Sequence, residues 1–391
     1  MNNVIDPILK YSVAIAGDKK LEVYTLYFSF LNFLGFDWKQ GGINVPVPAW
    51  VKFKVYPASY PIMMLIVSFL IIKLNVEVEP KTEFEMIKMI NGFIVSMTFI
   101  AAFAKLLYLR IIKNDILELL NMSVTVGPIS AEKPVVKDTI RSCVLYFILL
   151  NANVGTWTVG YLWLHNDLPF AAAFPWDEST VVGFSLSFNV DVLCAFYCSI
   201  GHTVLDISFP LVVSTMCWHI QRLEKLLSTL GKDYFIDRMI LDKAVDLHVR
   251  LLRQVIVCYN QLIVAQSVYT VLHSCILIYA VVKVSNKVEA ALSSVPMLSA
   301  SYAQLYMYCS YGQLLTDKTH TLSFAAYNNE WYRCPPKLRK SLVLFLEATK
   351  RAVHLKGFGN IQASLANYLH SLQDSVSYFL VLKTLTSDEN A

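Results

Sequence analysis

The apolar segment Gly359–Leu385 carries polar side chains that suit ion conduction better than catalysis. If this segment is helical, one stripe about 60° wide is polar on its inner part and apolar at its end; it consists of Asn367, His370, Asp374, Ser377, Val381, Thr384 and Leu385. Repeated around a symmetry axis, the stripe would form a wet vestibule whose carboxylate favours cations, closed by an apolar ring that gates by dewetting. Alternatively, these groups hydrogen-bond to neighbouring helices and line no pore.

The other reactive residues form no constellation for catalysis or metal binding. Cys194 and Cys198 share a helix face, but the sequence shows no further Cys or His ligands paired with them. The eight histidines are scattered, and we expect His202 and Asp206, four residues apart, to pair structurally. The sequence contains no nucleophile elbow, phosphate-binding loop or dinucleotide fingerprint. We therefore expect no enzyme, no metal and no cofactor.

Composition indicates that helices in a membrane must position these residues. Of the 391 residues, 55% are hydrophobic and 16% are charged, and the mean hydropathy is +0.48. Soluble domains average about 45–50% apolar residues and about 25% charged residues, so both values point to a membrane protein. A net charge of +4 gives no reason to expect nucleic acid as a partner. Seven segments are long and apolar enough to cross a bilayer, namely Tyr56–Val76, Phe84–Leu109, Ile140–Leu164, Val182–Cys217, Val255–Val284, Leu292–Leu315 and Gly359–Leu385.

The basic residues predict the orientation of these spans. With the N-terminus inside, 27 of the 33 Lys and Arg residues fall in cytoplasmic segments. Residues 1–54 are then cytoplasmic, with Leu21–Phe36 as a helix in the membrane interface, and the C-terminus is extracellular. G-protein-coupled receptors have the opposite topology, and their D-R-Y and N-P-x-x-Y motifs do not occur at the expected spans.

Several predicted helices are longer than a membrane is thick. The pattern that starts near Val182 runs without a breaker to Gly231, which corresponds to about 70 Å of helix, whereas a bilayer with its headgroups spans about 40–45 Å. The fifth and sixth spans are extended in the same way, and Leu338–Val353 is amphipathic. We therefore expect a cytoplasmic helical anchor bundle in which subunits meet. The resulting divisions are 55–315 for the first six spans, 210–255 and 316–356 for the anchor helices, and 357–391 for the seventh span and a short extracellular tail.

Short motifs in the C-terminal third resemble the insect odorant receptor family. They are Tyr308–Leu315, Ala325–Tyr332, Pro335–Lys340 and Ser375–Leu382. The outer loop with Leu168-Pro169 and Pro175-Trp176-Asp177 agrees with the resemblance, as do the chain length and the span count. Each motif is weak alone, but together they are specific.

This resemblance implies an all-α, seven-helix subunit of a ligand-gated, non-selective cation channel. Such a channel is a heterotetramer with a shared co-receptor, embedded in the lipid of the plasma membrane, with sensory-neuron dendrites as the expected site. The last helix would line the pore, with Val381 and Leu385 at the apolar gate and Thr384 at a position that is Gln in the co-receptor. Cations would pass Asp374 and Ser377. Because the chain lacks the co-receptor's long cytoplasmic insertion, it resembles a ligand-tuning subunit.

In that family a volatile organic ligand binds among the outer halves of the second, third, fourth and sixth helices. The corresponding residues here are mostly apolar and aromatic; they are Met89, Phe93, Met97, Asn153, Trp157, Tyr161, Phe188, Val192, Tyr302 and Tyr306. Trp157 and Tyr302 are the strongest candidates, and Gly155 would either open space for the ligand or allow close helix contact. The alternatives are a gustatory receptor, disfavoured by the absence of a C-terminal Gln-Phe, and a metabotropic receptor or a transporter.

Overall fold

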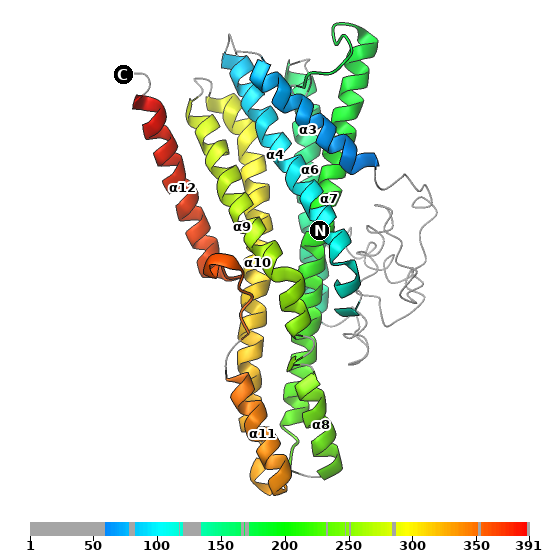
Figure 1. Ribbon diagram of the computed structural model, residues 1–391, viewed down its shortest axis with the longest axis vertical. Coiled ribbons are helices and arrows are strands. Elements are labelled where there is room, and N and C mark those ends of the chain that lie inside the picture. Colours follow the sequence, from blue (N-terminus) through cyan, green and yellow to red (C-terminus); the bar gives the residue numbers. More distant parts are fainter. Residues whose placement is uncertain are drawn as a thin grey trace.

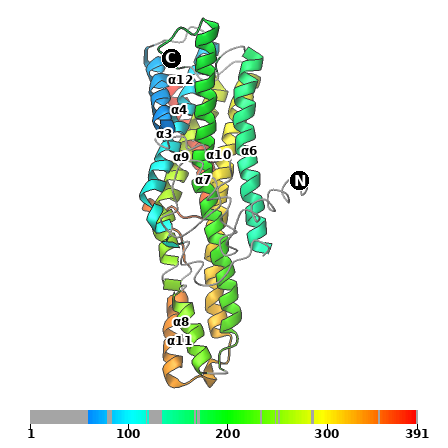
Figure 2. The ribbon, with the colours of Figure 1, turned by 90° about the vertical axis from the view of Figure 1, so that its right-hand side faces the viewer.

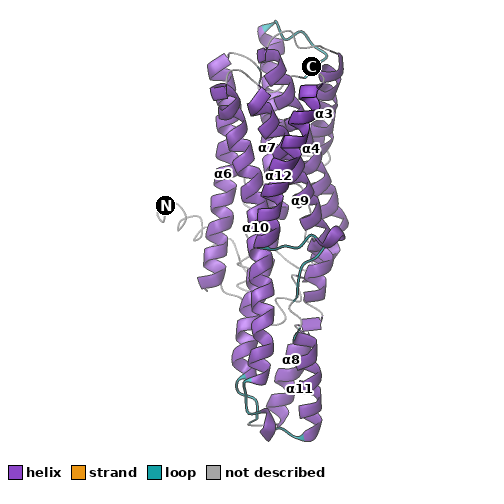
Figure 3. Cartoon of the chain, turned by 90° about the vertical axis from the view of Figure 1, so that its left-hand side faces the viewer, coloured by secondary structure: helices purple, strands orange, loops and turns teal. Residues whose placement is uncertain are grey.

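The structure, a computed structural model, describes residues 59–77, 83–116, 118–119, 134–165, 168, 172–231, 234–246, 248–249, 252–283, 287–350 and 353–388. Over these residues the chain folds into helices, and their β structure is limited to one isolated bridge between Lys356 and Gln362 (Figure 3). The prediction of an all-α fold is confirmed. The expected interfacial helix Leu21–Phe36 and the rest of residues 1–54 lie outside the described residues.

Seven long helices of the described part correspond to the seven predicted spans. They are α3 (Ser59–Glu77), α4 (Glu83–Ile111), α6 (Pro134–His165), α7 (Val181–Leu227), α9 (Leu252–Lys283), α10 (Lys287–Tyr327) and α12 (Leu365–Asp388). By length and composition alone, three segments of the described residues could cross a bilayer, namely Met89–Ile111, Val181–Leu227 and Leu252–Val282. Of the other four long helices, α10 and α12 carry more polar residues, which neighbouring helices must accommodate.

The last helix begins later than its predicted start at Gly359. Residues Phe358–Asn360 form a 3-10 turn in which Gly359 has a φ of +70°, a left-handed conformation that interrupts an α-helix. The segment that follows packs closely on α10, because a Cβ added to Gly312 would lie 2.2 Å from the Cβ of Ala363. Gly312 of the Tyr308–Leu315 motif thus lets α10 support the chain just before α12.

Two helices project beyond the others at one end of the molecule. α7 has 47 residues and α10 has 41, and α8 (Tyr234–Asp246) and α11 (Pro336–Thr349) lie beside their ends (Figures 1 and 2). Leu338, Leu342 and Phe345 form the buried face of α11. The structure therefore has the expected projecting helical bundle. Its location in the cytoplasm stays a prediction.

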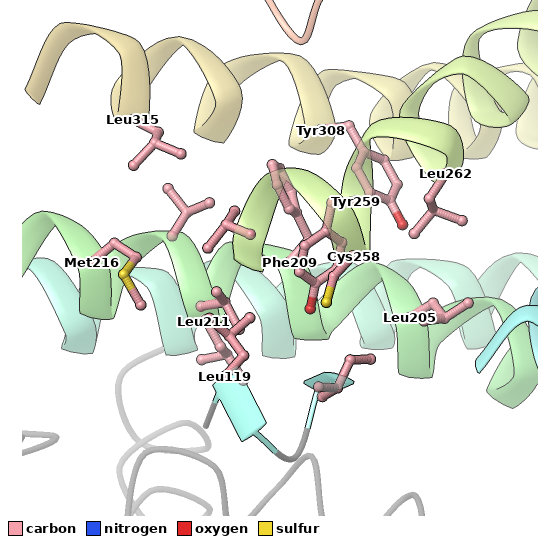
Figure 4. Close-up of a cluster of buried hydrophobic side chains, with 14 of the residues drawn as sticks. Leu119, Leu205, Phe209, Leu211, Met216, Cys258, Tyr259, Leu262, Tyr308 and Leu315 are labelled. Atoms are coloured by element: carbon pink, nitrogen blue, oxygen red, sulfur yellow. The ribbon is translucent and has the colours of Figure 1, made fainter. Parts of the chain in front are cut away.

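α7 is the central helix of the fold. Nearly every side chain from Cys194 to Cys217 is buried. Phe209 stacks on Tyr308 of α10, with ring centroids 5.3 Å apart, and packs against Tyr259 of α9 at 5.0 Å (Figure 4). A helix covered on all sides is held firmly by packing, so the polar groups that α7 carries are fixed in position.

Candidate functional site

A cavity of about 100 Å³ is lined by residues of α4, α6, α7, α9 and α10. Its lining residues lie in the N-terminal halves of α7 and α10 and in the C-terminal half of α9. Much of its lining is apolar, with Val95, Phe99, Leu150, Val154, Ala195 and Met297 among the residues that contribute. A concave, mostly apolar space with a few polar groups suits a small, largely apolar organic molecule. Cavities of similar size are known to hold molecules such as benzene, at about 150 Å³.

Several polar residues of the lining form a hydrogen-bonded chain. The Ser301 hydroxyl lies 2.9 Å from Nδ1 of His273, and Nε2 of His273 lies 3.5 Å from the Thr98 hydroxyl. The Tyr269 hydroxyl contacts the same Thr98 oxygen at 3.1 Å, and the Tyr269 ring stacks on the His273 ring with centroids 5.1 Å apart. α4, α9 and α10 thus meet at one polar corner, defined by Thr98, Tyr269, His273 and Ser301.

A buried carboxylate, that of Asp206 on α7, gathers four donors from three other helices. Its Oδ1 accepts hydrogen bonds from Lys105 Nζ at 2.7 Å and from the Tyr308 hydroxyl at 2.7 Å. Its Oδ2 accepts one from the Tyr146 hydroxyl at 2.9 Å and one from Nε2 of Gln304. The Asp206 side chain is 0% exposed and that of Lys105 is 8% exposed. These five residues, the Asp206 cluster, tie α4, α6, α7 and α10 together.

Gln304 joins the cavity to the Asp206 cluster. Its amide nitrogen donates both to Asp206 and to Nδ1 of His202, 3.3 Å away, and its oxygen accepts from Gln266 of α9 at 2.7 Å. The other nitrogen of His202 lies 3.1 Å from the carbonyl oxygen of Thr98. The predicted pairing of His202 with Asp206 is therefore indirect, since Gln304 lies between them. Among the described residues, no three His, Cys, Asp or Glu side chains gather into a possible metal site.

The predicted ligand residues fall in different places. Asn153 lines the cavity, whereas Phe93 and Tyr306 are exposed, at 43% and 51%. The rings of Tyr302 and Tyr306 contact that of Tyr368 on α12, with centroids 6.4 and 5.6 Å apart. The predicted residues that are half-buried and lie outside the cavity lining are Met89, Met97, Phe188, Val192 and Tyr302. The side chains of Trp157 and Tyr161 lie outside the described residues.

Sequence reasoning missed the contribution of α9. Gln266, Tyr269 and His273 follow one another at helical spacing inside an apolar span, and this polar face was the available signal. At Gly155 an added Cβ would meet no described atom within 4 Å, so no described helix contacts it closely, but Gly155 is not among the described residues that line the cavity.

α12 turns one face to α9 and α10 and leaves the predicted pore stripe uncovered. Ser371 and Ser375 are buried, and the Asn367 amide donates to the hydroxyl of Ser267 on α9 at 3.2 Å. Five members of the stripe, His370, Asp374, Ser377, Val381 and Thr384, are exposed in the single chain. The alternative of bonding to neighbouring helices thus holds for Asn367 at the inner end. The side chain of Leu385 lies outside the described residues.

Comparison with known proteins decides the family. A family model described as 7tm odorant receptor matches residues 85–375. The chain belongs to the insect odorant receptor family. It is thus a polytopic membrane protein of the seven-helix type, and it belongs to a family of receptors rather than of enzymes. The match also decides between the odorant and gustatory alternatives.

Individual relatives are distant. Odorant receptor 85c of Drosophila melanogaster is 24% identical over 228 residues, 56% of this chain and 57% of that protein. The odorant receptor coreceptor of Harpegnathos saltator is 23% identical over 137 residues, 35% of this chain and 29% of that protein. The match thus spans just over half of the curated receptor. The structure of the olfactory receptor OR5 from Machilis hrabei in complex with eugenol superposes with a TM-score of 0.76 at 16% identity, covering 94% of this chain and 100% of that one.

Proposed function

We propose that this chain is the odorant-binding subunit of a ligand-gated, non-selective cation channel that assembles with a shared co-receptor. The observation that carries the proposal is a mostly apolar cavity lined by five of the long helices of an odorant receptor. Two further findings support it: the similarity to a coreceptor and the eugenol complex of a protein with the same fold. We place the channel in the plasma membrane of sensory-neuron dendrites, with the N-terminus inside and the C-terminus outside.

α10 supplies a physical connection from the ligand site to the pore helix. Met297, Ser301 and Gln304 of α10 line the cavity, and Tyr302 and Tyr306 on the same helix contact Tyr368 of α12. A ligand that fits the cavity better when α10 is displaced stabilises the displaced state by its difference in affinity for the two states. Because α12 packs on α10, it moves with it.

The exposed stripe of α12 is assigned to the pore. In a ring of subunits, Asp374 and Ser377 attract and hydrate cations, and Val381, Thr384 and Leu385 form the constriction. An apolar ring excludes water when narrow and conducts when the helices move apart. Within the ligand site, Asn153 is the predicted contact residue that the cavity includes. Tyr302 and Tyr306 act in coupling as well as in any contact with ligand.

Filling the cavity tests this function. Ala195 is 6% exposed and lines the cavity, so the ring introduced by Ala195→Phe takes the volume that a ligand needs. We expect the concentration of an active odorant needed for half-maximal current to rise by about tenfold or more, which corresponds to at least about 1.4 kcal/mol of binding free energy. Ala152→Phe, at an exposed position of α6, is the matched control and should respond like the parent.

Both variants are to be compared at equal surface expression, measured by labelling of intact cells. An unchanged response of Ala195→Phe to every active odorant would contradict the assignment of the cavity as the ligand site.

A further inference from the structure

The hydrogen-bond donors and acceptors of the polar corner determine which ligands the cavity prefers. It consists of the Thr98, Tyr269 and Ser301 hydroxyls and the His273 imidazole, which together carry four exchangeable protons in the neutral state. Four contacts of 3.5 Å or less join these groups, one to a backbone carbonyl and three among themselves, and the Tyr269 and Ser301 side chains also interact. A backbone carbonyl can only accept a hydrogen bond. The contact with the carbonyl therefore determines which group donates in each of the other contacts.

That fixed bond is donated by Thr98. Its hydroxyl lies 2.9 Å from the carbonyl oxygen of Ile94. Because a carbonyl oxygen can only accept, the Thr98 hydroxyl donates its proton to this bond. The Tyr269 hydroxyl, 3.1 Å from the Thr98 oxygen, must then donate to it. Nε2 of His273, 3.5 Å from the same oxygen, makes a favourable contact only when it carries the imidazole proton.

This tautomer leaves Nδ1 of His273 as an acceptor. The Ser301 hydroxyl, 2.9 Å away, therefore donates to Nδ1. All four protons then form hydrogen bonds within the protein. The lone pairs of the Ser301 and Tyr269 oxygens remain able to accept a hydrogen bond from a ligand. The corner can accept a further hydrogen bond but has no proton left to donate.

Three other described residues of the lining, Gln304, His202 and Ser199, add no donor to this corner. Both amide protons of Gln304 go to Asp206 and His202, and the second nitrogen of His202 faces the Thr98 carbonyl. The Ser199 hydroxyl donates to Asn151 at 3.1 Å. Asn153, on α6, has an interaction of its own. No Asp or Glu is among the described residues that line the cavity, so a cationic ligand would lack a counterion there.

We propose that the preferred ligands are small neutral alcohols or phenols, whose hydroxyl donates a hydrogen bond to Ser301. The inference rests on the proposed function of the cavity as the odorant site. A ketone, aldehyde or ether of the same skeleton brings only acceptor oxygens to a corner that offers only acceptors. Burying that oxygen without a hydrogen-bond partner costs binding free energy. The hydroxyl of an alcohol instead forms a hydrogen bond with an acceptor of the corner.

Matched ligand trios test the proposal in cells that express the full chain with the family's co-receptor. The probes are hexanol, hexanal and hexyl methyl ether; cyclohexanol, cyclohexanone and cyclohexyl methyl ether; and benzyl alcohol, benzaldehyde and benzyl methyl ether. We expect the alcohol of an active trio to evoke current at a concentration about tenfold lower than its partners. Ser301→Ala should remove that preference by weakening the alcohol about tenfold while leaving its partners unchanged.

Two further variants distinguish loss of the Ser301 hydroxyl from a general effect on folding. Ser301→Thr retains a hydroxyl and should preserve the preference, and Ser299→Ala, at an exposed serine of the same helix, should match the parent. Equal potency within the trios, stronger responses to the carbonyl compounds, or responses only to unrelated volatiles would overturn the inference and leave the proposed function standing. Silence to every volatile, with surface expression confirmed, would instead contradict the proposed function.

Discussion

Asp206→Ala is expected to prevent the receptor from reaching the cell surface in folded form. The substitution leaves the Lys105 ammonium buried beside no carboxylate and strands three further donors, those of Tyr146, Gln304 and Tyr308. Removing one partner of a buried ion pair costs about 3–5 kcal/mol, which is a large part of the stability of an ordinary domain. Surface labelling and thermal unfolding of the detergent-solubilised protein measure the effect.

An exposed carboxylate provides the control for this experiment. Asp317 of α10 is exposed and accepts a hydrogen bond from Gln313 at 2.9 Å. Asp317→Ala should change stability by no more than about 0.5 kcal/mol. The double variant Lys105→Met, Asp206→Asn removes both charges and should recover part of the loss. Normal surface expression and unchanged thermal stability of Asp206→Ala would show that the Asp206 cluster does not stabilise the fold.

Val381→Ala is expected to raise the current that flows without odorant several-fold. Val381 is 53% exposed on the face of α12 that the chain's own helices leave uncovered. In the proposed channel a smaller side chain widens the apolar constriction and lowers the cost of wetting it. Whole-cell recording before and after odorant gives both the basal current and the remaining response.

Val376→Ala is the matched control for the gate. Val376 is 51% exposed on the same helix, but five residues at 100° each turn it well away from the stripe of Val381. Its basal current should equal that of the parent. If Val381→Ala leaves both the basal current and the odorant response unaltered, the assignment of the gate to Val381 is wrong.

The sequence predicted the helices well because hydropathy over some 20 residues is a local property. The order of the seven long helices and the projection of α7 follow from it directly. α12 starts later than predicted because Gly359 adopts a left-handed conformation that interrupts the helix, and hydropathy carries no information on this backbone angle.

The ligand site was harder to predict because a cavity depends on which helix faces meet. Successive residues of a helix point about 100° apart, so Tyr302 faces α12 while its neighbour Ser301 lines the cavity. Hydropathy does not indicate how a helix is rotated about its axis, and therefore not which of its residues line a cavity. The link from His202 through Gln304 to Asp206 joins residues 98 and 102 positions apart in the chain, and nothing in the sequence alone brings them together.

Whole-cell recording with G-protein signalling blocked, in cells expressing this chain with and without the co-receptor, tests the central claim most directly. The account predicts a rapid inward cation current on exposure to an active volatile, present only when both chains are expressed. A response that disappears when G-protein signalling is blocked would contradict the channel mechanism.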